Sequence, residues 1–165
     1  MEWIITPEWR TSVKLEWLNI EGSRKLISIS KGVPPEGTLA NLEVLRSYCN
    51  SMRNSLSFEL VQNLKDLQEI VIENCRRVET IIAATEDIDQ INEVNSAEVI
   101  LPKLQKLLLR SLPALRTICS SVTICDSLSF IEVVKCPELK VLPFFMEIRQ
   151  QLVDSLKEIK GNRNW

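Results

Sequence analysis

The sequence contains no histidine among its 165 residues. Histidine is the side chain that most often serves as a general base near neutral pH, activates a nucleophile or binds zinc. Its absence removes most of the mechanisms by which a small hydrolase could work, so a hydrolase on an unrelated fold is disfavoured. We predict that the chain is not an enzyme, with no catalytic residue, no metal ligand and no bound cofactor.

The chain also lacks an excess of either charge and any long apolar run. Its 20 basic and 22 acidic side chains create no strong field that would attract nucleic acid or an anionic membrane. The apolar runs, such as Leu107 to Leu109, are far shorter than the roughly 20 residues that span a bilayer. The opening MEWIITPEWR has no basic segment followed by a continuous apolar stretch, so it is not a signal peptide. We expect a cytoplasmic protein with no membrane span and no nucleic-acid partner.

No CxxC pair is present, although the chain has five cysteines. An odd number of cysteines at irregular spacing is typical neither of a zinc site nor of a dense disulfide framework. We therefore predict free, buried thiols at Cys49, Cys75, Cys119, Cys125 and Cys136.

What the chain does contain is a repeat. The stretch LPKLQKLLLRSLPALRTICSSVTI (101–124) and the following CDSLSFIEVVKCPELKVLPF (125–144) place apolar side chains at the same six positions. Copies that begin at Leu15 and Leu67 keep most or all of these positions. A weaker copy begins at Leu42, with Ser47, Asn50 and Arg53 at later sites, and a short one begins at Leu156. The unit LxxLxLxx(C/L)xxLxx(I/L) is close to the leucine-rich-repeat pattern, whose period is about 20 to 29 residues.

The repeat predicts an α/β leucine-rich-repeat solenoid formed by residues 1–165 as a single array of five or six units. The central LxL of each unit alternates with period two, which predicts a short strand, and parallel stacking of these strands buries a continuous apolar ladder. Cys75 and Cys136 fall where such repeats turn the chain, and Pro113 and Pro137 are expected to end the strands. The convex side should be irregular, 3₁₀ or short helical, because the segments left for it are short.

One unit is longer than the others, and the extra residues form a predicted acidic loop insertion at 83–100. Five carboxylates occur there without a single Lys or Arg, at Glu86, Asp87, Asp89, Glu93 and Glu98. The composition favours a solvated, mobile surface loop. Two alternatives remain open, namely a docking or regulatory segment for a basic surface and a calcium site. The calcium site is the weaker one because the required glycine is missing.

The residues between the inward-facing positions of each strand should line the concave face, where such solenoids bind partners. They mix aromatic, apolar and charged side chains, and Trp, Tyr and Arg are typical of protein interfaces. The candidate partner-binding residues are Trp17, Asn19, Glu21, Val44, Arg46, Tyr48, Glu69, Val71, Glu73, Lys106, Leu108, Arg110, Phe130, Glu132 and Val134.

The sequence allows two other interpretations of this face. Glu69 and Glu73 could simply pair with Lys106 and Arg110 on the next strand, forming an exposed salt ladder of little energetic value. A catalytic carboxylate pair of Glu73 and Glu132 is disfavoured because the strand between them carries two cations. The tryptophans Trp3, Trp9, Trp17 and Trp165 lie near the ends of the chain, where we expect them to cover the open termini of the array.

Three phrases, LPKLQKLLLRSLPALRTICSS, SLSFIEVVKCPELKVLP and NLKDLQEIVIENCRRVETII, resemble the C-terminal repeats of plant nucleotide-binding leucine-rich-repeat disease resistance proteins of the coiled-coil class. The likeness covers nearly the whole chain and is most specific from Asn63 to Pro143. It implies a protein-recognition and autoinhibitory module of an intracellular immune receptor. The chain departs from the family in having no GxxxxGK(S/T) loop, so ADP or ATP would bind only a nucleotide-binding domain that is missing here.

The resemblance also implies the partners. They would be a pathogen effector, a guarded host protein or the receptor's own nucleotide-binding domain, and the chain would be a fragment or truncated product of a larger receptor. An alternative function is a substrate adaptor for another enzyme such as a ubiquitin ligase, which an F-box-like helical segment would favour.

Overall fold

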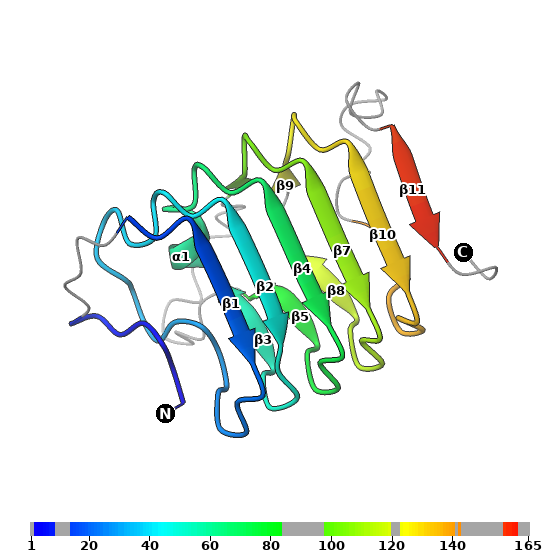
Figure 1. Ribbon diagram of the computed structural model, residues 1–165, viewed down its shortest axis with the longest axis horizontal. Helices are drawn as coiled ribbons and strands as arrows, with labels where there is room; N and C mark the ends of the chain where they lie inside the picture. Colours follow the sequence, from blue (N-terminus) through cyan, green and yellow to red (C-terminus); the bar gives the residue numbers. More distant parts are fainter. Residues whose placement is uncertain are drawn as a thin grey trace, which may run out of the picture.

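The structure is a computed structural model that describes residues 2–8, 14–83, 98–119, 123–140, 142 and 157–161. Six parallel strands follow one another in chain order to form the main sheet (Figure 1). The predicted leucine-rich-repeat solenoid is therefore confirmed. The strands are β1 (Trp17–Glu21), β2 (Val44–Tyr48), β4 (Glu69–Glu73), β7 (Lys106–Arg110), β10 (Phe130–Val134) and β11 (Glu158–Gly161).

The register of the main sheet aligns the same position of every repeat. Leu45, Ile70, Leu107 and Ile131 are consecutive partners across β2, β4, β7 and β10, and all are buried. Ile72, Leu109 and Val133 form a second buried row two residues further along the strands. Because side chains alternate across a strand, the residues between these two rows point away from the core.

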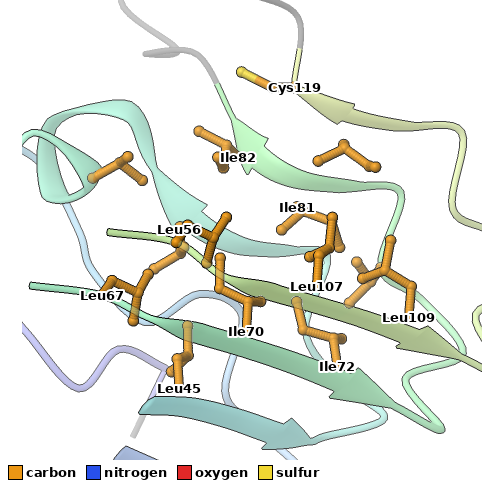
Figure 2. Packing of buried hydrophobic residues seen from close by; sticks show 14 of the residues in the cluster. Leu45, Leu56, Leu67, Ile70, Ile72, Ile81, Ile82, Leu107, Leu109 and Cys119 are labelled. Carbon is orange, nitrogen blue, oxygen red and sulfur yellow. The ribbon is translucent and has the colours of Figure 1, made fainter. Parts of the chain in front are cut away.

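The convex side contains parallel strands, whereas the sequence predicted irregular, 3₁₀ or short helical segments there. A second parallel sheet contains β3 (Asn54–Ser57), β5 (Thr80–Ala83) and β8 (Thr117–Cys119), and a third pairs β6 (Val99–Ile100) with β9 (Thr123–Ile124). The one described helix, α1 (Phe58–Val61), is a single turn whose Leu60 N–H donates to the capping hydroxyl of Ser57. The core lies between the main sheet and the second sheet, as the side chains in Figure 2 show.

Residues 2–8 continue the convex side beyond the first repeat, a feature that the repeat pattern did not predict. The N–H groups of Ile4 and Ile5 both donate to the carbonyl of Ile29, and the Lys31 N–H donates to the Ile5 carbonyl. Ile5 is buried in the core. The segment therefore adds one more strand-like layer to the N-terminal end of the solenoid.

The predicted role of the prolines in ending the strands is wrong. Strands β7 and β10 end one residue before Ser111 and Lys135, which have positive φ angles of 54° and 56°. Asn74 takes the same left-handed conformation after β4, with φ of 55°. This left-handed turn follows β4, β7 and β10, and after β7 and β10 it precedes Pro113 and Pro137 by two residues.

In the second repeat, the buried positions after the strand come one residue earlier than the repeat pattern predicts. The sequence comparison placed Asn50 and Arg53 at core positions, but both are exposed. Cys49 and Met52 are buried instead, because the left-handed residue that follows β4, β7 and β10 is missing after β2. Ser47 does occupy its predicted core position.

All five cysteines are free and buried, which confirms that prediction. At the turns after β2, β4 and β10, a thiol reaches the backbone of the preceding repeat. The Cys49 Sγ donates to the Ser23 carbonyl at 3.0 Å, and the Cys136 Sγ lies 3.6 Å from the Leu109 carbonyl. Desolvation raises the pKa of Cys75 and Cys136, and raises the pKa of Cys125 to about 12. These thiols are therefore structural.

Most of the predicted acidic insertion, residues 84–97, lies outside the described part of the chain. Its two ends are strand residues, since Ala83 closes β5 and Val99 and Ile100 form β6. Glu98 is described and exposed, whereas Glu86, Asp87, Asp89 and Glu93 are not described, and neither are Trp9 and Trp165. Trp3 is half-buried near the N-terminus, with the Lys31 ammonium 4.3 Å from the centre of its ring.

Candidate functional site: the concave face

We use the term concave face for the side of the main sheet that points away from the core. All fifteen residues predicted to line it lie on β1, β2, β4, β7 and β10. None of them belongs to the buried hydrophobic cluster.

Strand pairing arranges these residues in rows that run across the repeats. One row contains Trp17, Val44, Glu69, Lys106 and Phe130. A central row contains Asn19, Arg46, Val71, Leu108 and Glu132. Along the third, Glu21 pairs with Tyr48, and Glu73 pairs with Arg110, which pairs with Val134.

Arg110 joins the third row to the central row through two carboxylates. Its Nε and Nη2 donate to the two carboxylate oxygens of Glu132, the latter at 3.0 Å, while its Nη1 donates to Glu73. The hydrogen bonds from Arg110 lower the pKa of Glu132, and the same bonds raise the pKa of Arg110. The guanidinium thus bridges β4 and β10 across its own strand β7.

Glu69 is the centre of a second group of ion pairs. The Arg46 Nη2 lies 2.9 Å from one of its carboxylate oxygens, and the Lys106 Nζ lies 3.8 Å from the other. The predicted ladder between Glu69 or Glu73 and the cations of β7 is therefore confirmed. The structure extends it on both sides, to Arg46 on β2 and to Glu132 on β10.

Val71 departs from the prediction that this face is open to solvent. It points away from the core but is only 5% exposed. Its register partners are Arg46 and Leu108, and Glu69 and Glu73 flank it on β4. We attribute its burial to these longer side chains, because neighbours on the same face of a sheet are close enough to cover a short side chain such as valine. The middle of the face is therefore already packed.

Aromatic rings lie on both sides of this packed centre, each close to a cation. Trp17 on β1 is 59% exposed, and the Arg46 guanidinium lies 5.5 Å from the centre of its ring. Phe130 on β10 is half-buried, with the Lys160 ammonium 5.1 Å from its ring. Trp17 therefore contributes to this face rather than covering the end of the array.

The face also includes β11, which was not among the candidate residues. Glu158 and Lys160 continue the rows of Phe130 and Glu132. The sequence could have identified these two residues, because the short repeat that begins at Leu156 in SLKEIKG predicts which of its side chains face outward.

The geometry opposes acid–base chemistry at Glu73 and Glu132. A general acid needs a raised pKa, which burial or a neighbouring anion would provide, whereas Arg110 lowers the pKa of Glu132. Within the described ranges, no group of three or more metal-binding side chains comes together, and no helix is long and apolar enough to cross a membrane.

Comparison with known proteins identifies similar sequences. Residues 12–160 match the family model described as plant disease resistance protein RPS2-like, leucine-rich repeats. A curated relative, the "Probable disease resistance protein At4g27220" of Arabidopsis thaliana, is 33% identical over 108 residues, which cover 64% of this chain and 11% of the relative. The chain thus corresponds to a small part of that relative. No solved structure matches it significantly.

Proposed function

Since this chain belongs to the leucine-rich-repeat family of RPS2-like plant disease resistance proteins, we propose that its concave face recognises a protein partner in plant defence. In a longer intracellular receptor, the same face would also help to hold the receptor inactive until a pathogen is perceived. The partner would be a pathogen effector, a guarded host protein or another domain of the receptor. The chain itself would need no cofactor and would work in the cytoplasm.

The observation that supports this proposal most directly is the exposure of Trp17 beside ion pairs in which the cations and carboxylates of the concave face neutralise one another. Arg46, Arg110 and Lys106 are each paired with a carboxylate of the face, so the face offers few unpaired charges to a partner. Its binding energy would come mainly from rings and apolar surface such as Trp17 and Phe130. Aromatic anchors surrounded by polar contacts are the usual arrangement of energetically dominant interface residues.

The test is a double variant, Trp17→Ala with Phe130→Ala, which removes both rings and leaves the ion pairs of Arg110 in place. Each lost anchor should weaken partner binding by about 2 kcal/mol, or roughly thirtyfold. Partners would first be captured from leaf extract with the unaltered chain and identified, and their affinity for purified variants would then be measured by calorimetry.

The matched control is Val33→Ala, which removes an apolar side chain that is 66% exposed and lies outside the concave face. It should bind as the unaltered chain does. Equal affinity of the double variant and the control for every identified partner would reject the concave face as the recognition surface.

A further inference from the structure

A second surface lies at the carboxyl ends of the strands, away from the centre of the concave face. These ends lie side by side along one edge of the solenoid, where tight loops follow the strands (Figure 1). Two neighbouring hollows of about 560 and 450 Å³ occur along this edge, and Asn50 and Arg76 line both of them. We call the two hollows together the basic groove.

The described charged side chains of the basic groove are all cations. Arg24, Arg76 and Arg77 line the first hollow, Lys135 and Arg76 line the second, and no Asp or Glu of the described part of the chain lines either one. All four cations are exposed, and none forms an ion pair with another described residue. They differ in this from Arg46 and Arg110 of the concave face, whose charges are already matched.

The groove also offers neutral hydrogen-bonding groups that the fold holds in place. The Arg76 N–H donates to the Asn50 Oδ1 at 3.4 Å, which fixes the amide and leaves its Nδ2 as a donor. The Ser51 Oγ lies 2.8 Å from the Ser23 carbonyl and 2.7 Å from the Leu26 carbonyl, so its single O–H donates to this pair of carbonyls and ties the loops of the first two repeats together. Tyr48 lies where the groove meets the concave face.

The spacing of the cations indicates the size of the ligand. Arg24 follows β1, Arg76 follows β4 and Lys135 follows β10. The first and last of these strands are four places apart in the main sheet. At about 4.8 Å between neighbouring strands, the cations extend over about 19 Å. One phosphate or carboxylate group cannot contact cations at both ends, whereas an extended peptide of about six residues can.

We propose that the basic groove binds an acidic segment of a partner protein, with Asp or Glu side chains spaced along an extended backbone. Its carboxylates would form charge-assisted hydrogen bonds with Arg24, Arg76 and Arg77, for which the planar guanidinium is well suited. Lys135 and the Asn50 amide would hold the far end and the backbone. The groove adjoins the proposed recognition surface at Tyr48, but its four cations lie outside that surface, so the proposal does not depend on it.

The probe for this site is a fluorescein-labelled decapeptide of alternating Glu and Ser, followed by fluorescence anisotropy. The triple variant Arg24→Gln, Arg76→Gln and Arg77→Gln should weaken its binding by about tenfold or more, since three charge-assisted contacts are lost. Binding to the unaltered chain should also weaken as the salt concentration rises.

The matched control removes the same charge elsewhere, with Arg53→Gln, Lys65→Gln and Arg116→Gln, all exposed and outside the groove. It should bind the peptide within about twofold of the unaltered chain, a difference of less than about 0.5 kcal/mol. Absence of binding to the unaltered chain, or an equal loss in both triple variants, would overturn the proposal. So would displacement of the peptide by inorganic phosphate at concentrations too low to act through ionic strength, because that result indicates a compact anion pocket.

Discussion

At the scale of the residue, Arg110 is the side chain on which the concave face most depends. It donates to carboxylates from two different strands, Glu73 on β4 and Glu132 on β10. Removing it takes away the ion-pair partner that the two partly buried carboxylates share, leaving Lys160 as the cation that still acts on Glu132. Exposed ion pairs contribute little singly, but a side chain that joins three strands forms a network, in which the contribution is larger.

We expect Arg110→Gln to lower the free energy of unfolding by about 1 kcal/mol at neutral pH. The native pKa of Glu132 is lowered, so its stabilising contribution is present above the ordinary carboxyl pKa and is lost as pH falls through the lowered value. The difference between the variant and the unaltered chain should therefore shrink between about pH 7 and pH 3. Urea denaturation followed by circular dichroism measures it.

The control for this prediction is Arg116→Gln, which removes the same charge from an exposed position outside the face and should change stability by less than about 0.5 kcal/mol. A destabilisation by Arg110→Gln that stays the same at both pH values would show that lost packing, rather than the ion pairs, is responsible.

At the scale of the element, the second repeat carries two buried serines in its core. Ser47 and Ser55 are both fully buried at positions where other repeats carry apolar residues, such as Ile72 and Ile81. The Ser47 hydroxyl donates to the Met52 sulfur at 3.4 Å, whereas the Ser55 hydroxyl has no hydrogen-bond partner among the described residues. A buried polar group without a hydrogen bond costs about 1 to 3 kcal/mol.

Replacing Ser55 with Ala should therefore stabilise the protein, because it removes the unpartnered hydroxyl and leaves only a small change in volume. We expect the free energy of unfolding to rise by about 1 kcal/mol. Thermal and urea unfolding of the two proteins would show the change. Ser47→Ala is the comparison, since its hydroxyl is used, and it should be neutral or slightly destabilising. Destabilisation by Ser55→Ala would mean that its hydroxyl has a partner in solution.

At the scale of the whole molecule, each described strand of the main sheet pairs only with the strands beside it, so the position of a residue along the array determines its importance. Leu107 on β7 lies between β4 and β10 and is 1% exposed. Ile159 on β11 occupies the same place in its repeat but is 45% exposed, because no described strand follows it. The same apolar repeat position thus contributes more to the free energy of unfolding on β7, in the middle of the main sheet, than on β11, its last strand.

We expect Leu107→Ala to lower the free energy of unfolding by about 2 to 5 kcal/mol, the range for a leucine deleted from a packed core. Ile159→Ala should cost less than about 1 kcal/mol. Chemical denaturation of both variants, compared at equal protein concentration, checks the contrast. Similar losses at the two positions would contradict the neighbour-by-neighbour account of stability.

The sequence by itself determined the period, the strands and the side of each strand that faces the core. These properties depend on alternation within a few residues, so Leu107 and Leu109 are recognisable as core residues without any knowledge of their partners. The candidate residues of the concave face could be predicted for the same reason, as could the pairing of Glu73 with Arg110 on the next strand of the array.

Only the tertiary structure decided which residues of the second repeat enter the core and which side chains meet at the edge of the solenoid. These features depend on a missing turn residue and on repeats of unequal length. The shorter turn after β2 moves Cys49 and Met52 into the core, and a left-handed turn has no reliable signature when Asn, Ser and Lys all adopt it. The basic groove was not predicted either, because its cations lie in different repeats and only Arg24 and Arg76 share a repeat position, whereas Lys135 occupies another. Stacking the strands about 4.8 Å apart brings distant segments to one edge, and linear spacing does not encode that edge.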